Sequence, residues 1–498
     1  MAATTRAPDP LAGDRVWRRL DSRMLLVHPV NELLRFLPAV VGVFVVGESS
    51  GDGGVWWHVL AVGVPIALGL LRFVTTSFRV SDGQLELRRG LLNRTVLTAP
   101  LDRIRAVDLT ASPIHRLLGL AKVEIGTGSA TRGHGERLQL DSLGIGEART
   151  FRTALLHRTP AAEVDAGTAA HDEVLLRLDP AWIRYAPFTT SGLLIAFAAV
   201  GATSQFSGPL IGRLAHGTHL GRTAQAVPLW GALLVALLAF LVVISVFAVL
   251  GYVLTNWGFT LTRDPGSRSL HVVRGLLTSR ESSIETARLR GVEVHQPLGL
   301  RLAGGARLVG IVTGRQRRDS GSTPLVPPAP AGVVDGVGSL VLGDPVPFRM
   351  PLRHHGRAAT RRRYVRALGT TVPATAVWTV VVVALRWDPA LLLLDVLAVA
   401  GAWLLARDRG ARLGHGLTDH YLVLQAHTFG GRRDVLLREG IIGWGFQQSW
   451  FQRRAGLVTL VATTSAGKQG YRVYDVPEPV AVALARIAVP GLLDPFLA

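Results

Sequence analysis

The stretch SPIHRLLGLAKVEIGTG, residues 112–128, places a polar, arginine-bearing half-turn before a Leu-Leu-Gly step and a strand-like Val-Glu-Ile. We expect a strand to end in the polar turn and the Leu-Leu pair to enter the core. Gly119 then lets the backbone pass closely before the next strand begins. The stretch is interpreted as a corner inside a β module, and a binding role for Arg116 is the alternative interpretation.

The same corner occurs three times along the chain. An offset of 185 aligns residues 90–125 with 275–310 without a gap, and an offset of 337 places 112–120 on 449–457. Self-similarity at such a long spacing indicates a duplicated folding unit, because the repeats of a solenoid are far shorter. The sequence therefore predicts three copies of one module.

Each copy shows the period-two alternation of a β-hairpin, with turn residues between two apolar runs. These hairpins are predicted at 78–90, 260–275 and 416–431. Copies one and three end in stretches with helical periodicity, at 145–158 and 479–490. Copy two instead runs into a Pro/Gly-rich segment that we interpret as a linker without a clear helix.

The composition points to a membrane protein. Of 498 residues, 48% are apolar and only 18% charged, the mean hydropathy is +0.32, and the charges are clustered. A membrane-crossing helix needs about 20 mostly apolar residues. Six stretches come close, in three pairs, each pair preceding one module: 33–47 and 55–74, 188–206 and 227–254, 368–385 and 389–406.

The distribution of arginine predicts the orientation of these spans. The net charge is +19, and lysine occurs only at Lys122 and Lys468. The turns inside the three pairs hold just Arg213, Arg222 and Arg386, and basic residues in short loops stay in the cytoplasm. We therefore expect both termini and all modules to be cytoplasmic. The first residues lack the apolar core of a signal peptide.

The order of these features resembles the bacterial pleckstrin-homology membrane proteins, in the branch that carries three modules. The resemblance rests on five motifs: the Gly-Leu-Leu turns (90–92 and 275–277), the Ile-x-x-Val strand (104–107), the Ser-x-x-x-Arg-x-x-Gly-Leu corners (112–120 and 449–457), a Thr-Leu-Thr strand (260–262) and a proline-rich stretch (325–330). It implies modules of two bent antiparallel sheets closed by a C-terminal helix, tethered to a membrane and not enzymatic. It also implies a role in envelope stress or in resistance to membrane-active peptides.

The expected fold class is an α+β membrane protein with three pairs of transmembrane helices, each followed by a PH-like antiparallel β module with a C-terminal helix. The expected segments are a leader (1–32), transmembrane pair 1 (33–76), module 1 (77–160), a linker (161–186), pair 2 (187–256), module 2 (257–315), a Pro/Gly-rich and basic linker (316–367), pair 3 (368–407) and module 3 (408–492). Whether segment 33–47 spans fully, and whether the modules pack together, stays open.

The sequence carries no HExxH, P-loop, GxSxG or dinucleotide-binding motif, so we expect no catalytic residue and no cofactor. Cysteine is absent, which excludes disulfides and thiolate metal sites. His354 and His355 are interpreted as a solvated surface beside the membrane. No metal site is expected.

Two groups of arginines are candidate binding residues. Contacts to a ligand or partner are predicted for Arg103, Arg105, Arg116 and Arg453. Contacts to anionic lipid are predicted for the basic run before the fifth span, namely Arg357, Arg361, Arg362, Arg363 and Arg366, because arginines near the cytoplasmic leaflet favour anionic head groups.

The function predicted from these features is a non-catalytic membrane scaffold whose modules bind lipid head groups, peptides or a partner protein. The alternative is a six-helix transporter or lipid-handling protein. Its one intramembrane acid is Asp395, which is interpreted first as a helix-packing hydrogen bond. A nucleic-acid partner is not expected, because the arginines lie close to the spans and aromatic residues are not interleaved among them. The oligomeric state is left open.

Overall fold

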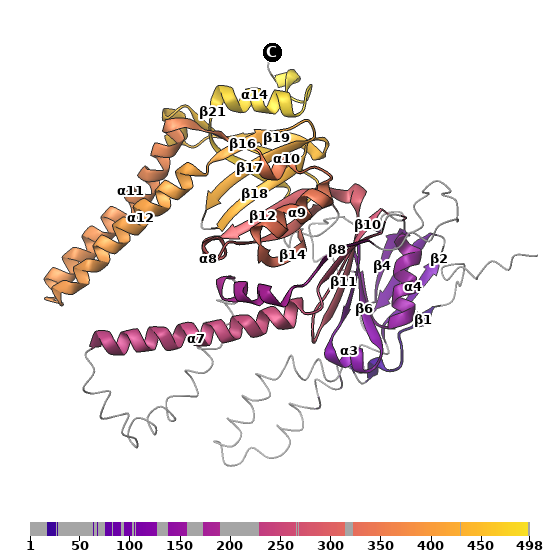
Figure 1. Ribbon diagram of the computed structural model, residues 1–498. Helices are drawn as coiled ribbons and strands as arrows, with labels where there is room; N and C mark the ends of the chain where they lie inside the picture. Colours follow the sequence, from indigo (N-terminus) through magenta and orange to yellow (C-terminus); the bar gives the residue numbers. More distant parts are fainter. Residues whose placement is uncertain are drawn as a thin grey trace, which may run out of the picture. The chain divides into compact units, whose positions relative to one another are not determined.

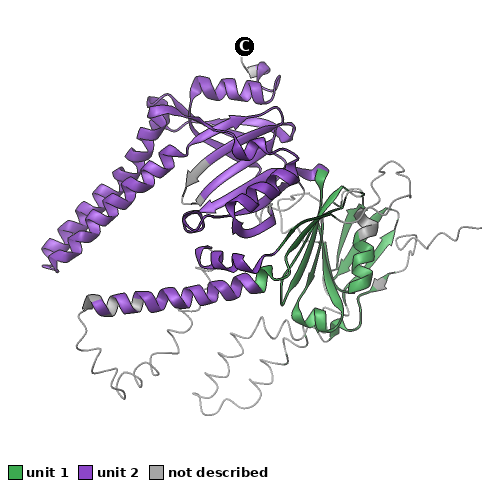
Figure 2. Cartoon of the chain, in the orientation of Figure 1, with its two compact units in different colours: residues 1–177, 254–286, 314–316 green, residues 178–253, 287–313, 317–498 purple. Residues whose placement is uncertain are grey.

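A computed structural model describes chiefly residues 17–27, 75–126, 138–156, 173–189, 229–313 and 322–496, with short gaps inside these ranges. The chain divides into two compact units, coloured separately in Figure 2. Unit 1 comprises residues 1–177, 254–286 and 314–316, and unit 2 comprises 178–253, 287–313 and 317–498.

Unit 1 contains two antiparallel sheets. One has the order β1-β2-β3-β4 and the other β7-β6-β5-β11-β10-β9-β8. Their strands are β1 (Arg18–Arg19), β2 (Ser77–Ser81), β3 (Gln84–Arg89), β4 (Thr95–Pro100), β5 (Ala106–Ala111), β6 (Leu120–Gly126), β7 (Leu138–Gly144), β8 (Glu173–Arg177), β9 (Thr260–Asp264), β10 (Ser269–Arg274) and β11 (Ser279–Glu285). Helix α4 (Ile145–Leu156) contributes Ala148 and Phe151 to the core between β2–β4 and β5–β7.

Unit 2 also contains two antiparallel sheets, ordered β14-β13-β12-β18-β17-β16-β15 and β19-β20-β21. Their strands are β12 (Leu289–Pro297), β13 (Gly305–Val312), β14 (Ser322–Pro330), β15 (Arg353–His354), β16 (Gly414–Leu417), β17 (Tyr421–Thr428), β18 (Gly430–Leu437), β19 (Ile441–Gln447), β20 (Leu457–Thr464) and β21 (Gly470–Pro477). Helix α14 (Glu478–Ala488) buries Leu484 and Ala485 in the core of this unit. The predicted hairpins and the helices closing copies one and three are confirmed.

Three long apolar helices are described, and Figure 1 shows two of them side by side as a hairpin. They are α7 (Leu229–Asn256), α11 (Gly356–Ala384) and α12 (Leu393–Ala411), the last preceded by the short helix η5 (Pro389–Leu392). Each is long and apolar enough to cross a membrane. They contain the expected spans 227–254, 368–385 and 389–406 almost entirely, whereas 33–47, 55–74 and 188–206 lie mostly outside the described residues.

The repeated corner is a five-residue helix in every copy, not the simple polar turn expected. These helices are α3 (Pro113–Leu117), α8 (Leu298–Leu302) and α13 (Trp450–Arg454), which coincide under both sequence offsets. The following glycine is left-handed each time, with φ of +69° at Gly119, as a tight passage requires. The expectation for the Leu-Leu pair is wrong, because Leu117 is 86% exposed.

The inward-facing residue of each corner helix is its third. In copy one, His115 lies 3.4 Å from the Ser142 hydroxyl; in copy three, Gln452 donates a 2.8 Å hydrogen bond to Asp475. Copy two has a buried Leu300 at this position. The helix is thus anchored through residue 115 and its equivalents, which the leucine pattern did not indicate.

The interpretation of 316–367 as a linker is wrong. Residues 322–330 form β14, which pairs with β13, and helix α9 (Ala331–Leu342) follows. Three glycines at 332, 336 and 338 hide this helix from sequence reasoning, since glycine is a poor helix former. Its buried face is nevertheless regular, with Val334, Val337 and Val341 at helical spacing.

The copies are joined by continuous β-ladders. We call β1–β7 with α4 module 1, β8–β14 with α9 module 2, and β15–β21 with α14 module 3. Strand β5 of module 1 pairs with β11 of module 2 (joint 1), and β12 of module 2 pairs with β18 of module 3 (joint 2). Module 2 is therefore divided between the two compact units.

Joint 2 holds a buried cluster of charges around Glu293 of β12, which is 1% exposed. Its carboxylate accepts hydrogen bonds from Lys468 at 3.1 Å and from the Tyr471 hydroxyl at 3.0 Å, and it lies 2.8 Å from the His295 ring. Burial alone would raise the pKa of Glu293, but the His295 contact and the charges of Arg432 and Lys468 lower it to about 2. Glu293 is therefore ionised, and joint 2 is held by polar contacts of a buried charge as well as by apolar packing.

Candidate functional site

The predicted lipid-contact arginines, residues 357–366, lie in the first turns of α11. The helix begins at Gly356, so residues expected in the linker belong to it. Ala359 and Arg363, four residues apart, are buried on the face that meets module 3. Because the basic segment is helical, some of its arginines face module 3 and others face outward.

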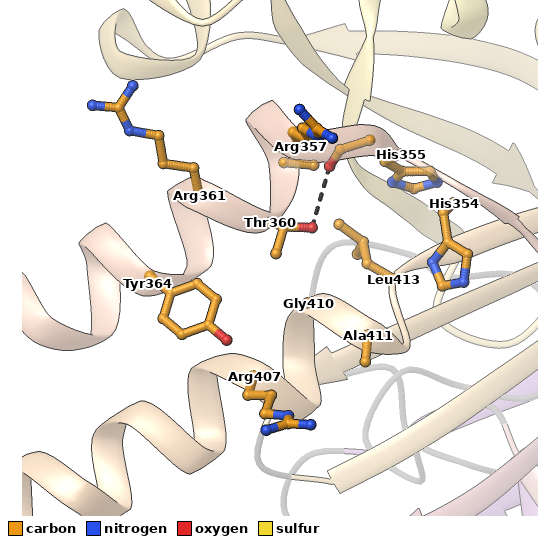
Figure 3. A pocket seen from close by; sticks show the side chains of 12 residues that line it. His354, His355, Arg357, Thr360, Arg361, Tyr364, Arg407, Gly410, Ala411 and Leu413 are labelled. Carbon is orange, nitrogen blue, oxygen red and sulfur yellow. Dashed lines mark hydrogen bonds between the residues drawn. The ribbon is translucent and has the colours of Figure 1, made fainter.

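A cavity of about 710 Å³ lies at the base of the α11–α12 hairpin (Figure 3). Its lining comes from the start of α11 and the end of α12: His354, His355, Gly356, Arg357, Ala359, Thr360, Arg361, Tyr364, Arg407, Gly410, Ala411 and Leu413. Small residues make the space, and Gly410 lets the helices approach, because a Cβ there would lie 2.9 Å from the Thr360 methyl.

Three exposed arginines surround this cavity, Arg357 and Arg361 on α11 and Arg407 on α12. Figure 3 shows Arg361 and Tyr364 extending from one helix and Arg407 from the other. Within the part of the chain that the structure describes, none of the three guanidinium groups has a carboxylate at ion-pair distance. Uncompensated guanidinium groups in a concave site are suited to binding a phosphate group.

Arg362 and Arg363, also predicted to contact lipid, point into the protein instead. Asp475 on β21 is fully buried; Arg363 lies 2.7 Å from its Oδ2 atom, and Arg362 pairs with its Oδ1 atom. Gln452 of the corner helix α13 donates to the same carboxylate at 2.8 Å. The pair thus fixes the base of α11 to module 3. Arg366 is exposed and does not line the cavity.

The two histidines before α11 differ from each other. His354 is exposed, but His355 is 3% exposed, so the expectation of a solvated surface is wrong for it. Its ring lies 2.8 Å from the Tyr474 carbonyl and 3.0 Å from the ring of His415. Burial, and for His355 also the neighbouring His415, lowers the pKa of each to about 4. Both are therefore neutral at pH 7.

Aromatic pairs mark the two ends of the α11–α12 hairpin. Tyr364 and Trp403 lie near the base with ring centroids 6.4 Å apart, and Trp378 and Trp387 lie near the tip, 5.8 Å apart. From Tyr364 to Ala384, where α11 ends, the helix advances about 30 Å at 1.5 Å per residue. This matches the hydrocarbon core of about 30 Å between the aromatic belts of a membrane protein.

Asp395 has a partner inside the hairpin. The Thr379 hydroxyl of α11 donates a 2.8 Å hydrogen bond to its Oδ2 atom. This confirms the interpretation of Asp395 as a helix-packing hydrogen bond.

The module arginines are not gathered into one site. Arg103 and Arg105 lie outside the described residues. Arg116 of α3 donates to the Leu276 carbonyl of module 2 across joint 1, whereas Arg453 of α13 is exposed. Among the described residues, no group of three or more His, Asp or Glu side chains is placed to hold a metal ion.

Sequence reasoning missed Arg407, Tyr364 and Asp475. Arg407 lies near the end of α12, within the sequence ARDRGAR, and this basic segment lies close in space to the one at the start of α11. No sequence signal distinguishes the inward Arg363 from the outward Arg361, because their roles depend on how α11 packs.

The comparisons with known proteins are consistent with three repeats. The sequence model of the bacterial PH domain matches residues 33–159, 196–331 and 364–488. No curated protein and no solved structure matches the chain.

Proposed function

This chain belongs to the bacterial PH domain family, and we propose that it is an integral membrane scaffold without catalytic activity, which binds anionic lipid head groups at the base of its α11–α12 hairpin. The modules, joined by β-ladders, present further surfaces for a partner on the cytoplasmic side. The observation that carries the proposal is the cavity lined by Arg357, Arg361 and Arg407.

Position and charge both support a lipid ligand. The cavity lies beside Tyr364 and Trp403, where an aromatic belt would meet the head groups. Neighbouring Arg362 and Arg363 share the single carboxylate of Asp475, whereas the cavity arginines have no carboxylate partner among the described residues and are available to an anionic ligand. Each arginine near an anionic surface contributes about 1 kcal/mol.

The test is binding of dioctanoyl phosphatidylglycerol to the purified full chain in neutral detergent, with dioctanoyl phosphatidylcholine as the uncharged comparison. The double variant Arg357→Gln/Arg361→Gln is expected to weaken binding of the anionic lipid by about 30-fold, as the loss of about 2 kcal/mol implies. The matched control Arg454→Gln/Arg472→Gln removes the same charge from exposed positions of module 3 and is expected to change binding less than threefold.

Equal losses in the cavity pair and in the control pair would show that only net charge matters, and would refute a built site. Equal binding of the two lipids by the parent chain would refute recognition of the head-group charge.

A further inference from the structure

Among the edge strands of the four sheets, two are equivalent to strands that pair with another module elsewhere in the chain, yet have no such partner among the described residues. Strand β4 ends the sheet β1-β2-β3-β4, and β19 ends the sheet β19-β20-β21. By the sequence offsets, β4 is equivalent to β11 and β18, and β19 is equivalent to β5 and β12. The two open edges are therefore the two halves of a joint that the chain already forms twice.

Both existing joints have the same register. Val107 lies opposite Ser283 in joint 1, and Val292 lies opposite Val435 in joint 2. Shifted by the offsets of 185 and 337, these pairs occupy the same positions of the repeat. The equivalent pair at the open edges is Trp444 and Thr98. Register is fixed wherever one face of a ladder is buried, so we expect every joint between two modules to have this register.

The open edge of β19 exposes a side chain that both joints bury. Leu109 of β5 is 4% exposed and Val294 of β12 is 2% exposed, whereas the equivalent Phe446 of β19 is 42% exposed. Its neighbour Trp444 packs on the core of module 3, and its buried indole Nε1 has no hydrogen-bond partner within the described residues. Module 3 thus has an incomplete core at this edge.

The open edge of β4 supplies complementary side chains. Leu97 and Ala99 face the core of module 1, so Val96 and Thr98 point to the other face of the strand. Val96 is 51% exposed and corresponds to the residue opposite Phe446. Thr98 corresponds to the residue opposite Trp444, where its hydroxyl can accept a hydrogen bond from the indole.

Charge does not protect either edge strand, and the one proline, Pro100, stands at the last residue of β4. The sequences TVLTAP and IIGWGFQ have no charged residue, although soluble edge strands usually carry lysine or an inward charge against pairing with other chains. An uncharged edge with exposed valine and phenylalanine is expected to be covered.

We propose that β19 of one chain pairs antiparallel with β4 of a second copy, with Phe446 opposite Val96 and Trp444 opposite Thr98. The occupant is a second copy because its β4 offers the same fold context and register as the two joints within the chain. The interface is heterologous, so repetition closes into a ring or extends into a filament. The assembly does not depend on the lipid site.

The corner arginines agree with this assignment. Arg116 of module 1 donates a hydrogen bond to the Leu276 carbonyl of module 2. Arg301 of module 2 donates a 2.9 Å hydrogen bond to Asp408 of α12, the helix that directly precedes β16 of module 3. Arg453 is the third equivalent residue, and it is exposed. In the assembly it faces the module that the second copy contributes.

Cysteine cross-linking in native membranes tests the register, because the chain has no cysteine of its own. Full chains with Val96→Cys and Phe446→Cys, carrying different tags, are co-expressed and oxidised. Residues directly opposite in an antiparallel ladder have Cα atoms about 4.5–5.5 Å apart, within disulfide range. A disulfide-linked product bearing both tags is expected. The control Thr95→Cys with Phe446→Cys should give less than one tenth of that yield, because Thr95 points to the opposite face.

Three results would overturn the proposal. The first is no mixed product. The second is equal yield from the Thr95 control. The third concerns a chain that carries both Val96→Cys and Phe446→Cys: if only this double variant cross-links, and it migrates as a monomer, β4 and β19 close within one chain.

A pair of charge variants tests the interface without cysteine. In joint 1, Glu281 lies 3.0 Å from Arg149 and 3.1 Å from Arg152 of α4. Val96 is equivalent to Glu281, and Arg486 of α14 is equivalent to Arg149. Val96→Arg is therefore expected to lower the oligomeric fraction in lipid nanodiscs at least tenfold, whereas Val96→Glu, facing Arg486, lowers it less than threefold. Since Val96 is exposed, both variants fold; equal effects of the two charges contradict the assigned joint.

Discussion

Replacing Asp475 with asparagine should loosen module 3 strongly, although the change removes no heavy atom. Asp475 is fully buried and has a φ of +55°, a conformation that asparagine tolerates nearly as well. The backbone and the packing are thus retained, and only the negative charge is lost. Arg363, which is 8% exposed, then keeps its charge without a counter-ion.

The magnitude follows from the burial of this pair. Removing one partner of a buried ion pair costs about 3–5 kcal/mol, because the remaining charge is left desolvated. The loss should appear as opening of β21 and α13, which Asp475 connects through Gln452. Since 1.4 kcal/mol is a factor of ten in an equilibrium constant, amide hydrogens of β21 should exchange at least about 100-fold faster.

Hydrogen–deuterium exchange of the full chain in detergent measures this opening locally, which suits a chain of several units better than one global midpoint. Peptides from β9–β11 of unit 1 serve as the internal control and should not change. The double variant Asp475→Asn/Arg363→Met should recover part of the loss, because it also removes a stranded charge. Acceleration below threefold in β21 would refute the view that this carboxylate stabilises the base of α11.

Two further outcomes follow from buried groups in unit 2. His355 and His415 have pKa values lowered to about 4, so the unfolded chain binds more protons than the folded chain between pH 6.5 and 4. Stability should therefore fall as the pH is lowered through that window, and His355→Gln should flatten the pH dependence of amide exchange, corrected for its intrinsic rate, in peptides of β16 and β21. In helix α9, Gly336 has open space around it, whereas a Cβ on Gly338 would lie 2.5 Å from the Phe348 ring. Gly336→Ala should therefore stabilise the protein by about 0.5–1 kcal/mol, and Gly338→Ala should destabilise it by about 1–3 kcal/mol. The reverse order of the two variants in thermal unfolding would contradict the packing of α9.

The repeat could be predicted because equivalent residues recur at the same positions of each copy. Glycines at 119, 304 and 456 occupy the same position of each copy under the offsets of 185 and 337, and each has the positive φ that ends the corner helix. Helix α9 was not predictable, because three glycines lower its local propensity and only packing on β13 and β14 compensates. The outward Leu117 was misjudged for a related reason: two adjacent leucines on a one-turn helix cannot both face the core.

The candidate site was predictable in part. The run that holds Arg357 and Arg361 stood out by charge, and its place before an apolar span indicated a membrane surface. The sequence did not show which of these arginines face outward and which face module 3, because Arg361 and Arg363 differ only in the direction that α11 gives them. Asp475, more than one hundred residues away in the chain, decides which arginines have a carboxylate partner.

By itself, the sequence determined that this protein has three copies of one β module and apolar helices rich in arginine at one end, because periodicity, length and charge are local properties of the chain. Only the tertiary structure decided that the modules share sheets through β5–β11 and β12–β18, which arginines point outward, and that β4 and β19 end their sheets. Those features depend on pairing between segments distant in sequence, and no local pattern encodes the partner of an edge strand.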